Sequence, residues 1–274
     1  AKVTPLMLAC QYNRIQNALI LLRKGASYTA KNRENGNNAF QIACENGHLE
    51  LVKAFMKEVQ VDVNLPGRDR MTALSLAALH GHYEVVEYLV ENGAKVTKKD
   101  KFKRTPLLNA IRGGFSKIVA YLLSKGSEYD FGDSSKNSPV HYACAYGWKE
   151  ILELLLKAGA NPTVENDWRV TPMEIAFLKN HFNIVKYLLD NALCDVNTKF
   201  NLDMRLLHYS FMKITPNSLE EMKYFLIEKN ADVNVQNFYG ESVIHLLAKF
   251  NFEQYQRDNR TFEFNRSNLL KKEI

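Results

Sequence analysis

The apolar positions of the chain follow a helical-hairpin pattern that is clearest in residues 72–93. This stretch reads TALSLAALHGHYEVVEYLVENG, in which the polar Thr72 precedes a short apolar helix. Gly81 interrupts the pattern, and a second helix then carries apolar residues spaced i, i+1, i+4 and i+5 from Val85. Gly93 follows at a position where a left-handed residue ends a helix. Because the hairpin has only one good apolar face, we expect it to bury that face against a neighbour.

The same pattern recurs at spacings of 33 to 37 residues. A nearly fixed period of this length is typical of stacked repeats rather than of a single globular core. Aligned on the residue that caps the first helix, the repeats begin at Thr4, Asn38, Thr72, Thr105, Ser138, Thr171, Arg205 and Ser242.

Three short motifs recur with the repeat. A Thr-Pro-Leu-His-like signature begins the first helix at residues 4–7, 105–108, 138–141 and 171–174. A Gly-Ala-like pair ends the second helix, and an Asp-Val-Asn-like segment follows it at 62–64, 195–197 and 232–234. These motifs resemble those of the ankyrin repeat family. The resemblance covers roughly residues 2–250 and implies an all-α ankyrin-repeat α-solenoid with short β-hairpin or loop fingers between helical pairs.

The last two repeats depart from the pattern. Repeat seven begins at Arg205 without a hydroxyl cap, and Pro216 lies in a lengthened loop between its helices. In repeat eight the pattern fails from Phe250 onward. We therefore predict a repeat array over residues 1–250, followed in 251–274 by a divergent end of the last repeat or a truncated continuation.

Composition narrows the class of protein further. Hydrophobic residues make up 46% and charged residues 24% of the chain, which is ordinary for a soluble folded protein. No run of 18 apolar residues and no signal peptide is visible. We interpret the four cysteines as free thiols in a reducing compartment. These features predict an intracellular, cytoplasmic protein, and leave cytoskeletal, ciliary and nuclear locations open.

The sequence lacks the common motifs of catalytic, cofactor and metal sites. HExxH, CxxC, GxxxxGK[ST] and GxSxG are all absent. His141, His208 and His245 share the last position of the signature, where the family's histidine bonds the start of the first helix. We predict that the chain is not an enzyme and has no catalytic residue, cofactor or metal.

The resemblance implies that a ligand contacts a concave face made of fingers and first helices. Its contact positions lie four, three and one residues before each cap and seven and eight residues after it. These sets include Gln11, Glu45, Asn46 and His80 in the early repeats. In the later repeats they are unexpectedly apolar, as binding surfaces are. The apolar candidates are Phe102, Tyr146, Trp168, Leu178, Leu202, Met204, Met212, Phe238, Tyr239 and Phe250.

A row of basic residues is the second part of the predicted surface. Two residues before the cap, the family favours Gly because the turn requires a positive φ, and Gly36 and Gly240 keep it. The repeats between them carry basic residues, and other cations lie close by. The row is either a solvated face or a surface that attracts an acidic partner. The basic candidates are Arg68, Arg70, Lys101, Lys103, Arg104, Lys136 and Arg169.

These observations predict a non-catalytic scaffold that binds a protein partner with an acidic segment, with Phe102, Trp168, Leu202 and Tyr239 as anchors. Two alternatives remain: the cytoplasmic ankyrin arm of a larger chain (a channel, a regulated enzyme, or a cytoskeletal or axonemal component), or a pathogen effector. A net charge of +6 is modest for a long array, and no recognition-helix motif is present, so nucleic acid and anionic membranes are disfavoured. The sequence does not indicate the partner's identity or the oligomeric state.

Overall fold

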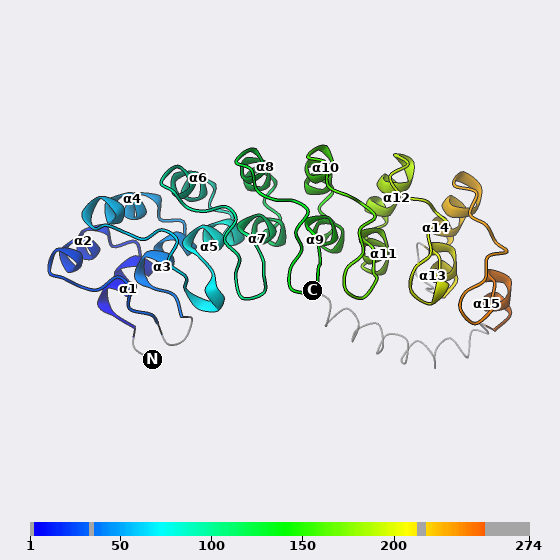
Figure 1. Cartoon of the computed structure of the whole chain (residues 1–274), viewed down its shortest axis with the longest axis horizontal. Coiled ribbons are helices and arrows are strands. Elements are labelled where there is room, and N and C mark those ends of the chain that lie inside the picture. The colour runs from blue at the N-terminus through cyan, green and yellow to red at the C-terminus, as the bar shows by residue number, and fades with distance from the viewer. Residues whose placement is uncertain (1–2, 33–35, 213–217, 250–274) are drawn as a thin grey trace. The chain divides into compact units, whose positions relative to one another are not determined.

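The computed structural model describes residues 3–32, 36–212 and 218–249 of the chain, and in these ranges every regular element is a helix. The chain divides into two compact units, residues 1–134 with 150–159 and residues 135–149 with 160–274. Each unit is built from helical pairs joined by loops (Figure 1). The all-α prediction is therefore confirmed, and the described fingers are loops rather than β-hairpins.

The first unit contains four complete helical pairs among its described residues. Their first helices pack against one another in sequence order, and their second helices form a second row (Figure 1). The pairs are α1 Pro5–Gln11 with α2 Ile15–Arg23, α3 Ala39–Glu45 with α4 Leu49–Glu58, α5 Ala73–His80 with α6 Tyr83–Glu91, and α7 Pro106–Gly113 with α8 Ser116–Ser124. Helix α10 (Lys149–Lys157) lies almost wholly in this unit, and a short turn, η1, spans Arg68–Arg70.

The second unit repeats the arrangement less regularly. Helix α9 packs on α11, and α13 packs on α14 and α15. The elements are α9 Pro139–Tyr146, α11 Pro172–Leu178, α12 Phe182–Asp190, η2 Asn201–Asp203, α13 Leu206–Met212, α14 Ser218–Lys223, the π-helical η3 Tyr224–Glu228 and α15 Val243–Lys249. The predicted loop around Pro216, Phe250 and the predicted terminal segment 251–274 lie outside the described residues.

The first helices begin where the capping pattern predicts. Thr72 accepts a hydrogen bond at 3.2 Å from the amide of Ser75, and Asn38 accepts one at 2.9 Å from the amide of Gln41. Each bond satisfies an amide that the helix itself leaves without a partner, which stabilises the helix by about 1 kcal/mol. The same bond is made by six of the seven predicted caps with a hydroxyl or amide side chain: Thr4, Asn38, Thr72, Thr105, Ser138 and Thr171.

Repeat seven has Arg205 where the other repeats have a hydroxyl or amide cap. The amide of Arg205 donates to Nδ1 of His208 at 3.2 Å, and the same bond joins the cap residue to the histidine in repeats five and eight. The Arg205 guanidinium is buried and donates to the carbonyl oxygens of Asp203 and, at 3.2 Å, Gln236. Arg205 therefore joins two neighbouring fingers of the second unit instead of capping its own helix.

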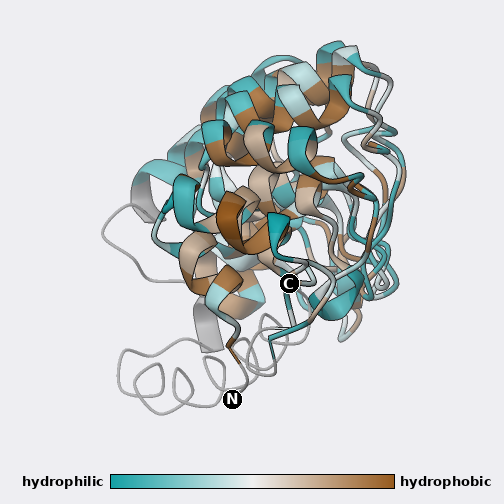
Figure 2. Cartoon of the chain, turned by 90° about the vertical axis from the view of Figure 1, so that its left-hand side faces the viewer, coloured by the Kyte–Doolittle hydropathy of each residue, from teal (hydrophilic) through white to brown (hydrophobic). Residues whose placement is uncertain are grey.

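The apolar stripes of the hairpins meet between the two helix rows. Along α6, the predicted stripe residues Val85, Val86 and Leu89 are buried, and the fourth, Val90, is half-buried. Phe55 and Leu107 are buried in neighbouring pairs. Figure 2 shows hydrophobic residues alternating with hydrophilic ones along the helices. Burying a side chain of this size stabilises the fold by about 1.5–3 kcal/mol, so each pair depends on its neighbours.

Turn glycines and histidines fasten successive pairs together. In the turn between the helices of repeat three, Nε2 of His82 donates to the carbonyl oxygen of Glu45 at 2.8 Å. In repeat six, His181 bonds the carbonyl oxygen of Ala145 in the same way at 3.0 Å. Each ring fills the space that a Cβ atom on the preceding repeat's turn glycine, Gly47 or Gly147, would occupy.

Candidate protein-binding surface

The fingertips adopt the left-handed backbone that the glycine preference predicts. In the first unit, φ is 64° at Arg70 and 60° at Lys103; in the second it is 59° at Lys136 and 58° at Arg169. A left-handed conformation costs a residue with a Cβ atom roughly 1–2 kcal/mol. The chain thus places basic residues where glycine would be cheaper. In repeat seven the same position is Asp203, so the basic series ends with Arg169.

A buried acidic or amide side chain holds three of the fingertips. Asp100, five residues before its cap, accepts hydrogen bonds from the amides of Phe102 at 2.8 Å and Arg104 at 2.9 Å. Asn166 and Asn237 make the equivalent pair of bonds in their own repeats. Sequence reasoning missed this role; the recurrence of Asp or Asn five residues before the cap is the signal that could have revealed it.

Phe102 is the exposed apolar residue of the first unit's basic finger. Its side chain is 41% exposed, with Cζ of Arg104 4.5 Å and Nζ of Lys101 5.8 Å from the ring centroid. The finger is hydrogen-bonded to its neighbour, because the amide of Lys101 donates to the Asp69 carbonyl oxygen at 2.6 Å. An aromatic ring flanked by cations on a fixed loop suits a partner that offers both apolar and acidic groups.

The charges on this finger differ in how far they are already neutralised. The Arg104 guanidinium lies 2.8 Å from the Asp100 carboxylate, and only 15% of the Arg104 side chain is exposed. It therefore supports the Phe102 ring and adds little free charge, contrary to the prediction that placed it among the attracting cations. Arg70, Lys101 and Lys103 are exposed, and Lys101 lies 3.8 Å from the carboxylate of Asp69.

An exposed aromatic residue outside the predicted positions adds to this surface. Phe131 is exposed, and Nζ of Lys99 lies 4.4 Å from its ring centroid. The amide of Ser134 donates to the Phe102 carbonyl oxygen at 2.8 Å, which joins the two fingers. Phe131 precedes its cap by seven residues, so the family's contact positions gave no reason to select it.

The fingers of the second unit carry apolar side chains. Leu202 is 56% and Phe238 68% exposed, and the amide of Phe238 donates to the Leu202 carbonyl oxygen at 2.8 Å. Tyr239 is also exposed and meets the Phe238 ring edge-on at 5.5 Å. In the same unit Lys136 is paired with Asp167 at 2.7 Å, and Arg169 is exposed. The structure thus brings Leu202, Phe238 and Tyr239 together as one exposed apolar cluster.

Several apolar candidates are less accessible than predicted. Met204 is buried, and its sulfur accepts a hydrogen bond from Nδ2 of Asn237 at 3.8 Å; it belongs to the packing beneath the finger. Trp168 is half-buried against Ala145, Val170 and Ile175. Met204 therefore packs on neighbouring residues, and Trp168 does so in part.

The remaining candidates lie near the ends of first helices. Tyr146 at the end of α9 is partly exposed and stacks on Tyr142 at 6.3 Å. Leu178 and Met212 are half-buried at the ends of α11 and α13. Arg68, the first residue of η1, is exposed.

The arrangement of metal-ligating side chains and thiols in the described part of the chain does not favour reactive chemistry. No group of three His, Cys, Asp or Glu side chains is arranged there to hold a metal ion. All four cysteines are free thiols, as predicted. Burial raises the pKa of Cys10 to about 12 and that of Cys194 to about 11. Such thiols stay protonated at neutral pH and are poor nucleophiles.

The helical pairs, capped first helices and loop fingers define a helical-repeat protein. A family model for ankyrin repeats (3 copies) matches residues 6–100 and 95–166, and the chain belongs to the ankyrin repeat family. Ankyrin repeat domains are protein–protein interaction scaffolds and are generally not enzymes. Among the described helices, none combines the length and apolar character needed to cross a membrane.

Proteins with similar sequences or structures are diverse. The chain is 34% identical over 272 residues to poly [ADP-ribose] polymerase tankyrase of Caenorhabditis elegans, a match that covers 89% of this chain and 12% of that protein. It is 40% identical over 78 residues to a probable 26S proteasome regulatory subunit p28 of Saccharomyces cerevisiae, covering 28% of this chain and 34% of the relative. The crystal structure of the human ASB11 ankyrin repeat domain superposes with a TM-score of 0.66 at 28% identity, covering 76% of this chain and 90% of that one. The chain thus spans only a small part of these two curated relatives.

Proposed function

We propose that the chain is a non-catalytic scaffold that binds a segment of a protein partner on its fingers and first helices. The observation that carries this proposal is the exposure of large apolar side chains on hydrogen-bonded fingertips, with Phe102 among cations in the first unit. Exposed apolar residues held on rigid loops are typical of the centres of interfaces.

The partner segment that fits the first unit is acidic and contains an apolar anchor. Phe102 offers the apolar contact, and Arg70 and Lys103 offer exposed positive charge. Both cations occupy left-handed positions that disfavour them. Backbone strain of this kind tends to persist at functional sites. The basic fingertips thus support attraction of acidic groups over a merely solvated face.

The proposal is tested with peptides selected from a displayed random library on the whole chain. Phe102→Ala should weaken the binding of the selected peptides by about 1–3 kcal/mol, a loss of affinity of roughly 5- to 150-fold. The melting temperature should change little. The matched control is Ile20→Ala, which removes another exposed large apolar side chain, from α2. Equal losses in the two variants, or no loss in either, would contradict the proposal.

The charges are tested by association kinetics at low salt. The double variant Arg70→Glu/Lys103→Glu should slow the association of acidic peptides and flatten its salt dependence, because rim charges act mainly on the encounter rate. Lys53→Glu on α4 is a single-site control for a charge change away from the fingers. An unchanged association rate in the double variant would remove the role assigned to the basic fingertips.

A second candidate is that the chain is the ankyrin arm of a larger protein in the cytoplasm. It is supported by the small share of the relatives that the matches cover, among them a human transient receptor potential cation channel, subfamily A member 1, of which 10% is matched. The sequence of the complete transcript decides this point, since it would or would not encode membrane-spanning or catalytic segments. The four free thiols agree with a reducing compartment.

A further inference from the structure

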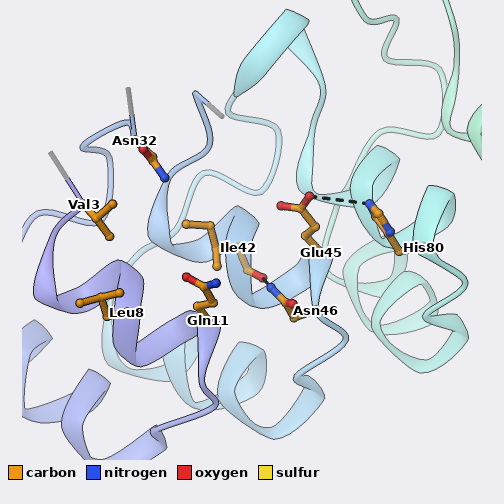
Figure 3. A pocket seen from close by; sticks show the side chains of 8 residues that line it. All are labelled: Val3, Leu8, Gln11, Asn32, Ile42, Glu45, Asn46 and His80. Carbon is orange, nitrogen blue, oxygen red and sulfur yellow. Dashed lines mark hydrogen bonds and ion pairs between the residues drawn. The ribbon is translucent and has the colours of Figure 1, made fainter. Parts of the chain in front are cut away.

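A pocket outside the fingers described above opens at the first helices of the first three repeats (Figure 3). Its volume is about 360 Å³, which is large enough for one long side chain. It lies wholly within the first unit. The residues that line it are Val3, Leu8, Gln11, Asn32, Ile42, Glu45, Asn46 and His80.

The lining divides into an aliphatic part and a polar part. Val3, Leu8 and Ile42 form the aliphatic part, and Val3 and Leu8 are exposed. The polar part contains Glu45 as its only carboxylate, together with three amide side chains and the imidazole of His80. A long side chain with an apolar stem and a positively charged head matches this division, because lysine and arginine bury their stems while their heads stay polar.

The carboxylate of Glu45 is held in place before any ligand binds. Nδ2 of Asn37 donates to its Oε2 at 3.0 Å, and Nε2 of His80 lies 3.7 Å from its Oε1 (Figure 3). The backbone beneath it is fixed by His82, which donates to the Glu45 carbonyl oxygen at 2.8 Å. A carboxylate can accept several hydrogen bonds, so capacity remains for a further donor.

Two more features favour a cation. Gln11, Glu45 and His80 are the last residues of α1, α3 and α5, so three helix C-termini, with their partial negative charge, meet the pocket. Nδ2 of Asn46 donates to the Ile42 carbonyl oxygen at 2.8 Å, which leaves the amide oxygen as an acceptor.

We propose that this pocket binds a basic side chain, arginine or lysine, of the protein partner. The stem lies along Leu8 and Ile42, and the cationic head is bound by Glu45 and by the amide oxygen of Asn46. This inference rests on the proposed function only in taking the ligand from a protein partner. It implies a partner of mixed charge, with a basic residue for the pocket and acidic residues for the fingers.

The test titrates blocked single amino acids into the whole chain and follows the side-chain amide signals of Gln11 and Asn46 by NMR. N-acetyl-arginine-methylamide and N-acetyl-lysine-methylamide are the two cationic probes, and the better of them identifies the preferred head group. The citrulline analogue, which keeps the shape of arginine without its charge, should bind at least about tenfold more weakly. Glu45→Gln should cause a similar loss while its remaining oxygen still accepts from Asn37.

Glu50→Gln is the matched control, because it removes an exposed carboxylate from α4 and changes the net charge equally. It should bind the probes as the original chain does. Binding that is equal for citrulline and arginine, a Glu45→Gln variant that binds normally, or the absence of binding by either cation would overturn the inference.

The pocket test and the finger test can fail independently of each other. If Phe102→Ala weakens the selected peptides while Glu45→Gln leaves the titrations unchanged, the fingers bind a partner and the pocket inference is wrong. If Glu45→Gln alone has an effect, the pocket binds cations and the finger proposal is wrong.

Discussion

At the scale of single residues, the fingertips keep a left-handed backbone that favours glycine, although several of them carry another residue there. Glycine two residues before the cap signals a left-handed position, and the structure confirms that conformation at Gly36 and Gly240. Lys103 has the same left-handed conformation, although its Cβ atom makes that conformation unfavourable. The conformation was predictable from the sequence because it is local to one turn.

Replacing Lys103 by glycine should therefore separate stability from binding. Lys103→Gly relieves the left-handed strain, and after the greater entropy of glycine in the unfolded chain is subtracted, the net gain in stability should be about 0.5–1 kcal/mol. Association with acidic peptides should slow, because an exposed charge is lost. Urea denaturation and stopped-flow binding measure the two effects.

Lys101→Gly is the control, since Lys101 is in the same finger but not in a left-handed conformation. This substitution should destabilise the chain, because glycine then adds flexibility without relieving strain. If Lys103→Gly destabilised the protein as much as Lys101→Gly does, the strain argument would be wrong.

At the scale of the element, a finger depends on one side chain that fixes its turn. The Asp100 carboxylate accepts hydrogen bonds from two backbone amides of its own loop and from the Arg104 guanidinium. In the sequence Asp100 is simply an acidic residue among lysines, and sequence position alone does not show that its carboxylate is buried. Asn166 and Asn237 show that an amide can hold the same turn.

Asp100→Ala should cost about 1–3 kcal/mol, because two backbone amides and the guanidinium lose their acceptor. Asp100→Asn should cost much less, since an amide oxygen accepts the same backbone bonds in repeats six and eight. Thermal unfolding of both variants measures the difference. Equal losses in the two would show that the ion pair, rather than the turn, is what the finger needs.

The packing of neighbouring fingers explains where the predicted binding surface was inaccurate. Family contact positions indicated which residues lie on fingers, and Phe102, Leu202 and Phe238 are indeed exposed there. They did not indicate how deep a side chain sits beneath a neighbouring finger, so Met204 was expected at the surface and is buried. Most polar residues of the Glu45 pocket were already among the contact positions, but the pocket itself was not predicted, because only the packing brings side chains from three repeats together.

At the scale of the whole molecule, the period in the sequence was sufficient to predict the architecture. Within each unit, helical pairs pack on their neighbours in sequence, so the local pattern already contains most of the fold. Repeat seven follows the period less closely, because a buried arginine, Arg205, takes the place of the hydroxyl cap and bonds two fingers. That role could not be interpreted from spacing alone.

The buried His208 should make the stability of the protein depend on pH. Burial lowers the pKa of His208 below its ordinary value of 6.5, and the charge of Arg205 lowers it further, while the backbone carbonyls of Glu241 and Val235 and the Glu241 carboxylate partly oppose this. Below pH 6.5 the unfolded chain then takes up a proton before the folded chain does. Stability should be full at pH 7.5 and should fall as the pH drops from 6.5 towards the lowered folded pKa, by at most about 1.4 kcal/mol per pH unit.

His208→Gln should flatten this dependence between pH 7.5 and 5.5. A glutamine is tolerated at this signature position in repeat two, where Oε1 of Gln41 accepts from the amide of Asn38 at 3.0 Å. His245→Gln, at the same position but exposed in repeat eight, is the control and should keep the original pH profile. Urea midpoints at three pH values are sufficient, and parallel profiles for the original chain and His208→Gln would contradict the assignment.

The histidine rings that occupy the space beside Gly47 and Gly147 have a consequence for how such chains can be recombined. A glycine in one repeat packs directly against the histidine ring of the next, although the two lie some 35 residues apart in the sequence. A chimera whose junction falls between them can inherit a bulky residue facing a ring, or an empty space facing a glycine. Junctions that carry both members over together should give folded hybrids more often, whether the exchange is made by evolution or in the laboratory.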